Sequence, residues 1–112
     1  MIQVKTPWDY VLSYNGKTAV IDTKSTANAS FSNSKIEGHQ VQAMLSHSAH
    51  GTIGGYVVWL RLENQVLFIP ATRLATLYSV RGSIGWRDAH CAPLGPCGNM
   101  DVRKIFEPLG GV

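Results

Sequence analysis

The dipeptide Asn15-Gly16, placed between two apolar segments, is the feature that most constrains the fold of this chain. Both central positions of a type I′ turn need a positive φ, and Asn-Gly is a favoured pair for them, so the dipeptide predicts a tight β-hairpin. If Tyr14 and Lys17 close the turn, facing residues have numbers that sum to 31 (14 + 17). This register sets Asp9 directly opposite Asp22.

The two facing carboxylates predict a cation between them. Their Cβ atoms would lie roughly 5 Å apart, where like charges repel unless a divalent ion is bound. Lys24 follows Asp22 by two residues and therefore projects from the same face of the strand. Two oxygen ligands and an ammonium on one surface suit metal-dependent phosphodiester hydrolysis. The alternative is that Asp9 caps a strand while Asp22 and Lys24 are solvent-facing charges on an edge hairpin.

The apolar residues of the hairpin argue against the edge position. Val11 and Val20 share the parity of the carboxylates, and the other face carries Tyr10, Leu12, Ala19 and Ile21. A strand pair that is apolar on both faces is expected inside an α/β layer structure. Charges on such a buried strand need a partner or a metal ion.

The middle of the chain predicts a helix beside this site. Residues 25–34 are polar and indicate a loop, and Ser34-x-x-Glu37 resembles a capping box that would start a helix at Lys35. The helix would run to about Ser48, with Gln40 on an otherwise apolar stripe. Gln40 is either a hydrogen-bonded boundary residue or a side chain that projects toward the metal site.

The remaining elements complete the order β-β-α-β-β-α. We expect a turn over 51–55, strands over 56–62 and 65–69, a helix over 71–80 with Leu74, Leu77 and Tyr78 inward, and a short helix from Asn99 or Asp101 to Phe106 that buries Val102, Ile105 and Phe106. This order predicts an α/β fold with a mixed β-sheet flanked by α-helices. The 112 residues suffice for a single domain over 1–112.

Charge and composition favour an anionic partner. The net charge is +3, and residues 81–96 mix Arg81, Trp86 and Arg87 with glycines, which suits contacts to a nucleic-acid backbone and base. The alternative for this segment is a surface loop whose tryptophan packs on the core. No apolar run approaches the ~20 residues of a membrane helix, so we expect a cytoplasmic protein without a membrane partner. Cys91 and Cys97 lack a usual zinc-finger spacing and are expected as free thiols.

The motif order P-x-D, hairpin, D-x-K resembles the PD-(D/E)xK nuclease superfamily. Residues 6–74 resemble, within it, the RecU-type Holliday junction resolvases, through T-P-W-D-Y (6–10), Y-N-G-K (14–17), V-I-D-T-K (20–24), S-F (30–31), H-Q-V-Q-A-M (39–44) and V-L-F-I-P-A-T-R-L (66–74). The resemblance implies a restriction-endonuclease-like core. It makes Asp9 and Asp22 metal ligands, with the backbone carbonyl of Thr23, and Lys24 the catalytic lysine. It also supports a catalytic role for Gln40.

The expected activity is that of a Mg²⁺-dependent endodeoxyribonuclease, with Mn²⁺ as a substitute, acting as a homodimer on branched or four-way-junction DNA. We expect DNA contacts from a basic and aromatic set, namely Lys5, Lys35, Arg81, Trp86 and Arg87. We expect two departures from the family pattern: the sequence offers neither the N-terminal helix nor an obvious stalk-sized insertion, and Asp22 stands where Glu is more usual. The alternatives are a phage-type nicking or general endonuclease, and a catalytically inactive DNA-binding module.

Overall fold

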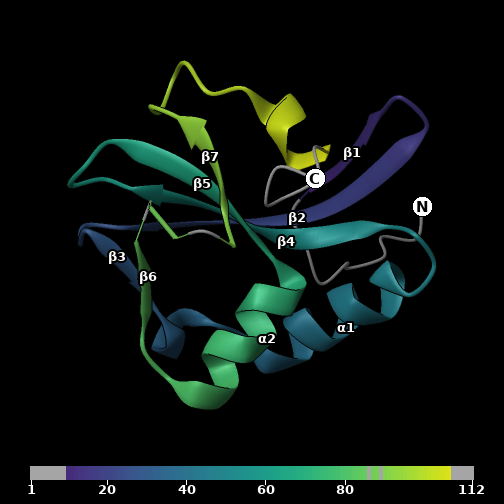
Figure 1. Ribbon diagram of the computed structural model, residues 1–112, viewed down its shortest axis with the longest axis horizontal. Coiled ribbons are helices and arrows are strands. Elements are labelled where there is room, and N and C mark those ends of the chain that lie inside the picture. Colours follow the sequence, from purple (N-terminus) through teal and green to yellow (C-terminus); the bar gives the residue numbers. More distant parts are fainter. Residues whose placement is uncertain (1–9, 86, 89, 107–112) are drawn as a thin grey trace, which may run out of the picture.

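A five-stranded mixed β-sheet is the centre of the molecule, with strand order β1-β2-β4-β5-β7 (Figure 1). The computed structural model describes residues 10–85, 87–88 and 90–106. The strands of this sheet are β1 (Tyr10–Tyr14), β2 (Lys17–Thr26), β4 (Ile53–Leu60), β5 (Gln65–Pro70) and β7 (Ala92–Gly95). β2 and β4 run parallel, and the other neighbouring pairs run antiparallel. The predicted α/β class with a mixed sheet is confirmed.

The hairpin has the predicted turn and register. Asn15 and Gly16 have φ values of 53° and 76°, and the pairs run from Tyr14 with Lys17 to Tyr10 with Ile21, all summing to 31. Asp9 lies outside the described residues, so its pairing with Asp22 stays a prediction. The predicted burial on both faces is found for β2. It is wrong for β1, because β1 is an edge strand of the described sheet and the helices pack on β4 and β5.

The two helices, α1 (Gly38–Ser48) and α2 (Ala71–Val80), cover one face of the sheet, below it in Figure 1. The core under them joins side chains of β2, β4 and β5 to the helices, and includes Val20, Tyr56, Leu67, Met44 and Leu74. The 3-10 helix η2 (Val102–Phe106) lies over the opposite face, where Ile105 and Phe106 pack with alternate strand residues such as Ile21 and Phe68. The strands β2, β4 and β5 therefore contribute to two cores through their period of two.

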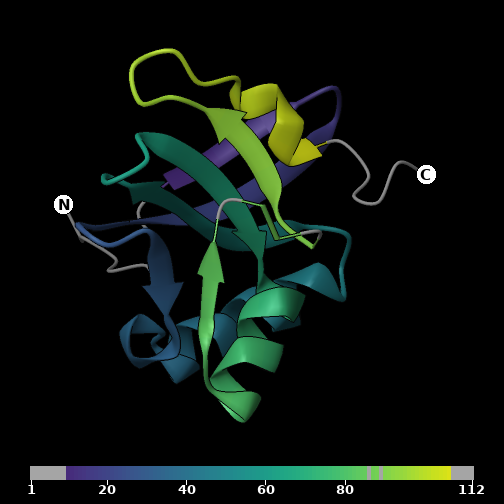
Figure 2. The same cartoon turned by 60° about the vertical axis from the view of Figure 1, so that its left-hand side comes forward.

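A two-stranded sheet of β3 (Ser30–Ser32) and β6 (Ser83–Gly85) stands beside the helices, as Figure 2 shows. Two expectations are corrected: residues 25–34 are not all loop, since they include β3, and residues 81–96 contain β6 as well as β7 of the five-stranded sheet. Phe31 and Ile84, which pair across this small sheet, are fully buried in the helix-side core. These two apolar side chains anchor polar, serine-rich segments that had no strand pattern of their own.

Several predicted boundaries are wrong by a few residues. The segment before the first helix forms the 3-10 turn η1 (Asn33–Lys35), and α1 begins at Gly38 rather than at Lys35. β4 begins at Ile53, so the expected 51–55 turn is shorter; a Cβ on Gly55 would overlap the Phe68 ring, which explains a glycine inside this strand. The predicted last helix is the 3-10 helix η2.

Two side chains predicted to be inward are instead exposed. Tyr78 is 52% exposed and Val102 is 43% exposed, whereas the prediction holds for Leu74, Leu77, Ile105 and Phe106. Tyr78 lies against Gly38 at the start of α1, where there is no side chain to cover it. Val102 occupies the first position of a short 3-10 helix that buries only its last residues.

Candidate functional site

Asp22 and Lys24 of β2 form an ion pair on the helix side of the sheet. The two residues alternate with Ile21 and Thr23, and they share the face of Val20, which belongs to the helix-side core. Lys24 Nζ lies 3.0 Å from Asp22 Oδ2, and the two side chains are 23% and 8% exposed. A carboxylate this deeply buried needs a counter-charge, and the ammonium supplies it.

Tyr56 of β4 connects this pair to helix α1. It is the register partner of Asp22 on the parallel neighbouring strand, and it is fully buried. Its hydroxyl donates a hydrogen bond to Gln40 Oε1 at 2.5 Å and accepts one from the backbone N–H of Glu37 at 3.1 Å. The Lys24 ammonium lies 5.3 Å from the centroid of its ring, within cation–π range.

Glu37 places a second carboxylate on the same ammonium. Its Oε2 lies 3.6 Å from Lys24 Nζ, and its side chain is half exposed. The predicted capping box would have turned this side chain back onto the helix start. Glu37 is instead the N-cap of α1 without a side-chain cap hydrogen bond, and its own N–H is bonded to Tyr56. The carboxylate is therefore directed to the lysine rather than to the helix.

The surroundings of Lys24 keep it charged. Burial disfavours the ammonium, but the hydrogen bond to Asp22 and the negative charges of Asp22 and Glu37 together hold the pKa of Lys24 above its ordinary value. Burial also raises the pKa of the Tyr56 phenol, which stays neutral. The lysine can thus act at neutral pH as a fixed positive charge and not as a base.

The structure brings three of the predicted catalytic residues into one neighbourhood: Asp22, Lys24 and Gln40. Gln40 is 5% exposed and reaches the pair through Tyr56. Thr23 lies between Asp22 and Lys24 on β2 and is exposed. Asp9, the fourth predicted catalytic residue, lies outside the described residues.

The predicted DNA-binding residues are spread over the surface around β3 and β6. Lys35, at the end of η1, Arg81, the C-cap of α2, and Arg87, after β6, are all exposed. Lys35 and Arg81 belong to neighbouring segments, because the Asn33 N–H donates to the Gly82 carbonyl at 3.0 Å. Lys5 and Trp86 lie outside the described residues.

Sequence reasoning missed Glu37 and Tyr56 as members of this site. Glu37 was assigned to a capping box, and Tyr56 to the start of an apolar strand. The signal that could have found Tyr56 is the parallel pairing of β2 with β4, which sets Tyr56 beside Asp22. That register depends on residues far apart in sequence and has no local pattern.

The donor atoms around Lys24 are oxygens, the type of ligand that a hard divalent cation prefers. Asp22 and Glu37 offer carboxylate oxygens that already share one cationic group, and oxygen ligands are those that Mg²⁺ prefers. Within residues 10–85, 87–88 and 90–106, however, no cluster of three or more His, Cys, Asp or Glu side chains is found. A complete ligand set needs a further oxygen donor besides these two carboxylates.

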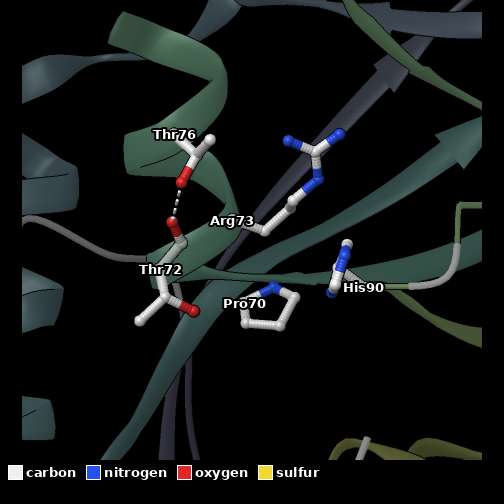
Figure 3. Close-up of a pocket in the computed structure, with 5 residues that line it drawn as sticks. All are labelled: Pro70, Thr72, Arg73, Thr76 and His90. Carbon is white, nitrogen blue, oxygen red and sulfur yellow. Dashed lines mark hydrogen bonds between the residues drawn. The ribbon is translucent and has the colours of Figure 1, made fainter. Parts of the chain in front are cut away.

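A separate pocket of about 460 Å³ lies at the start of α2 (Figure 3). The residues lining it are Pro70, Thr72, Arg73, Thr76 and His90, and none of them belongs to the Asp22–Lys24 neighbourhood. The Arg73 guanidinium is held by Asp88, with Nη2 and Oδ2 2.9 Å apart, and this hydrogen bond keeps the pKa of Asp88 below its ordinary range. The pair ties the segment after β6 to α2.

Both cysteines are free thiols, as the sequence predicted. Cys91 is buried beside Asp88, and burial raises its pKa to about 12, so it is a protonated core residue. Cys97 is exposed. Among the described helices, none is long and apolar enough to cross a membrane.

A mixed sheet with an Asp-x-Lys strand facing two helices is consistent with a nuclease-like α/β core. Comparison with protein families matches residues 1–89 to RecU, described as Recombination protein U. The match covers most of the 112 residues, and the chain therefore belongs to the RecU family. This is a family of Holliday junction resolvases of DNA recombination, and the resemblance inferred from the motifs is confirmed. No curated protein matches the chain.

Proposed function

We propose that this RecU-family chain is a metal-dependent endodeoxyribonuclease that resolves four-way DNA junctions. The observation that carries the proposal is the buried pair of Asp22 and Lys24, 3.0 Å apart, on the helix side of β2. A buried ion pair is weak support for stability, because desolvation of both charges offsets most of their attraction. Its presence in a family of nucleases favours a chemical role.

Lys24 has the properties of a transition-state stabiliser. Hydrolysis of a phosphodiester adds negative charge to the phosphate oxygens as the water attacks, and a fixed cation nearby lowers the barrier. The neighbouring carboxylates hold the pKa of Lys24 above its ordinary value, so its charge is present throughout the neutral range. In the proposed reaction Lys24 contacts a nonbridging oxygen or the attacking water, and Asp22 fixes the position of the ammonium.

Asp22 would also hold the metal ion, together with Asp9 and the backbone carbonyl of Thr23. The oxygen donors suit Mg²⁺, with Mn²⁺ as a substitute. When bound, the ion would supply Lewis-acid activation of the scissile phosphate and of the attacking water. Glu37 shares the Lys24 ammonium with Asp22 and would add a second negative charge to the site.

DNA binding is proposed to rest on exposed cations around the site. Lys35 and Arg81 lie on adjoining segments beside β3 and β6, and Arg87 follows β6; Lys5 and Trp86 complete the proposed set. Because phosphate contacts release counterions, affinity should fall with salt by about one unit of log–log slope per phosphate neutralised. One active site cuts one strand, so symmetric resolution of a junction needs a two-fold homodimer.

The test is cleavage of a labelled four-way junction beside a linear duplex and a flap, each with Mg²⁺ and with EDTA. The proposal predicts cleavage only with Mg²⁺, and a modest preference for the junction. Binding without cleavage under every metal condition would support an inactive DNA-binding module instead. Equal affinity for junction and duplex across a salt series, with the duplex cut as fast, would support a general or nicking endonuclease.

A further inference from the structure

The hydroxyl of Tyr56 contacts both the start of α1 and Gln40, a buried polar side chain of that helix. It accepts from the Glu37 N–H at 3.1 Å and donates to Gln40 Oε1 at 2.5 Å. Glu37 is the N-cap of α1, and Gln40 lies in its first turn. The hydroxyl thus fixes the helix end from the neighbouring strand, in place of a local capping side chain.

The ring of Tyr56 contacts the other half of the site. Its centroid lies 5.3 Å from Lys24 Nζ, and Tyr56 is the register partner of Asp22. Phe31 supports the ring from the side, with centroids 6.0 Å apart and planes at 87°. A fully buried ring held by strand pairing and an edge-to-face contact is a rigid base on which to place the ammonium.

Hydrophobic packing would be served equally well by phenylalanine at this position. A buried phenol costs free energy unless its hydroxyl is hydrogen-bonded, and here both of its hydrogen-bonding functions are used. Their two partners belong to the helix that also sends the Glu37 carboxylate to Lys24. Capping by Tyr56 leaves that carboxylate available for the lysine, since Glu37 makes no side-chain cap bond.

We propose that Tyr56 is a positioning residue of the nuclease site, which sets the distance between the Asp22–Lys24 strand and the Glu37–Gln40 end of α1. This inference rests on the proposed function, because it assigns Tyr56 to that same site. Tyr56 acts through Lys24, Glu37 and Gln40 and does not itself touch the reacting atoms. Its loss should reduce the rate of the chemical step and leave DNA affinity unchanged.

Tyr56→Phe is the first test variant, because it keeps the ring and removes both hydrogen bonds. We expect kcat to fall by about ten- to hundredfold, the scale on which small misplacements reduce catalysis, with KM within about twofold of wild type. Tyr14→Phe, at the hairpin end of β1, is the matched control and should keep the wild-type kcat. An unchanged kcat per folded molecule in Tyr56→Phe would overturn the proposal and leave Tyr56 a packing residue.

A second readout does not depend on activity. NMR of the full chain should show the Glu37 amide protected from hydrogen exchange in wild type and exchanging faster in Tyr56→Phe, with a shift of the Lys24 ammonium ¹⁵N signal. Gln40→Met, which leaves Tyr56 intact, should also move the Lys24 signal, and the double variant should add little. If wild type cuts no DNA, the proposed function fails, but these signals still decide the positioning role: unchanged signals in Tyr56→Phe refute it.

Discussion

Replacing Lys24 by methionine should destabilise the metal-free protein more than replacing Asp22 by asparagine. Methionine keeps an unbranched, slightly shorter side chain and removes the ammonium, with its charge and its hydrogen-bond donors. At 3.0 Å and an effective dielectric constant of about 20, the attraction between Lys24 and Asp22 is about 5.5 kcal/mol. Most of it offsets desolvation of the two groups, so the measured effect is the cost of the charge left behind.

That cost differs between the two partners. Without Lys24, the Asp22 carboxylate stays buried at 8% exposure and lies on the same side as a second carboxylate, Glu37. Removal of one partner of a fully buried pair costs about 3–5 kcal/mol, and the partial exposure of this pair lowers the expectation to about 2–3 kcal/mol. Without the Asp22 charge, Lys24 is 23% exposed and keeps Glu37 at 3.6 Å, so Asp22→Asn should cost about 1 kcal/mol.

The assay is urea denaturation at pH 7 in EDTA, at low and at high salt. Lys35→Met is the matched control, because Lys35 is exposed, and it should stay within about 0.5 kcal/mol of wild type. Saturating Mg²⁺ should recover part of the stability lost in Lys24→Met, since a cation again neutralises the carboxylates. Equal stability of Lys24→Met and Lys35→Met would show that the buried pair does not exist as described.

Three further results are expected. Mg²⁺ without DNA should raise the melting temperature of wild type but not that of Asp22→Asn. The stabilisation of wild type should be about 2.7 kcal/mol at a hundredfold excess of Mg²⁺ over its Kd, and identical curves with and without Mg²⁺ would exclude a preformed metal site. Gly55→Ala should unfold at much lower urea than wild type, because its Cβ would overlap the Ile69 carbonyl and the Phe68 ring; unchanged stability would contradict the packing of β4 on β5. Asp88→Asn should be less stable than wild type at pH 7, and the difference should shrink below about pH 4. The reason is that a carboxyl whose pKa is lowered on folding loses its contribution to stability as the pH falls through the folded pKa. A constant difference down to pH 2 would contradict the Arg73–Asp88 pair.

Local chemistry predicted the parts of the fold that depend on neighbouring residues. Asn15-Gly16 determined the turn and the register of β1 with β2, and Pro70 marked the boundary where β5 ends and α2 begins. The shared face of Asp22 and Lys24 followed from strand alternation, whereas their ion pair is seen only in the structure. These predictions succeeded because turn geometry and side-chain period are properties of short segments.

The rest depends on contacts between distant segments. The start of α1 was placed three residues early, because its N-cap N–H is satisfied by Tyr56 of another strand and not by the Ser34 side chain. β3 and β6 are short and serine-rich, and they are strands because Phe31 and Ile84 reach the core. Glu37 joins the site only through the packing of α1 on β4.

The rate of four-way-junction cleavage by Asp22→Asn decides whether Asp22 belongs to a nuclease site. Asp101→Asn is the matched control, because Asp101 precedes η2 on the opposite face of the sheet and pairs with Arg103. In Mg²⁺ we expect wild type and Asp101→Asn to cut the junction. Asp22→Asn should not cut it, and should bind it at least as tightly, since one negative charge facing the phosphate is removed. Cleavage by Asp22→Asn at the wild-type rate would contradict the assignment of this site.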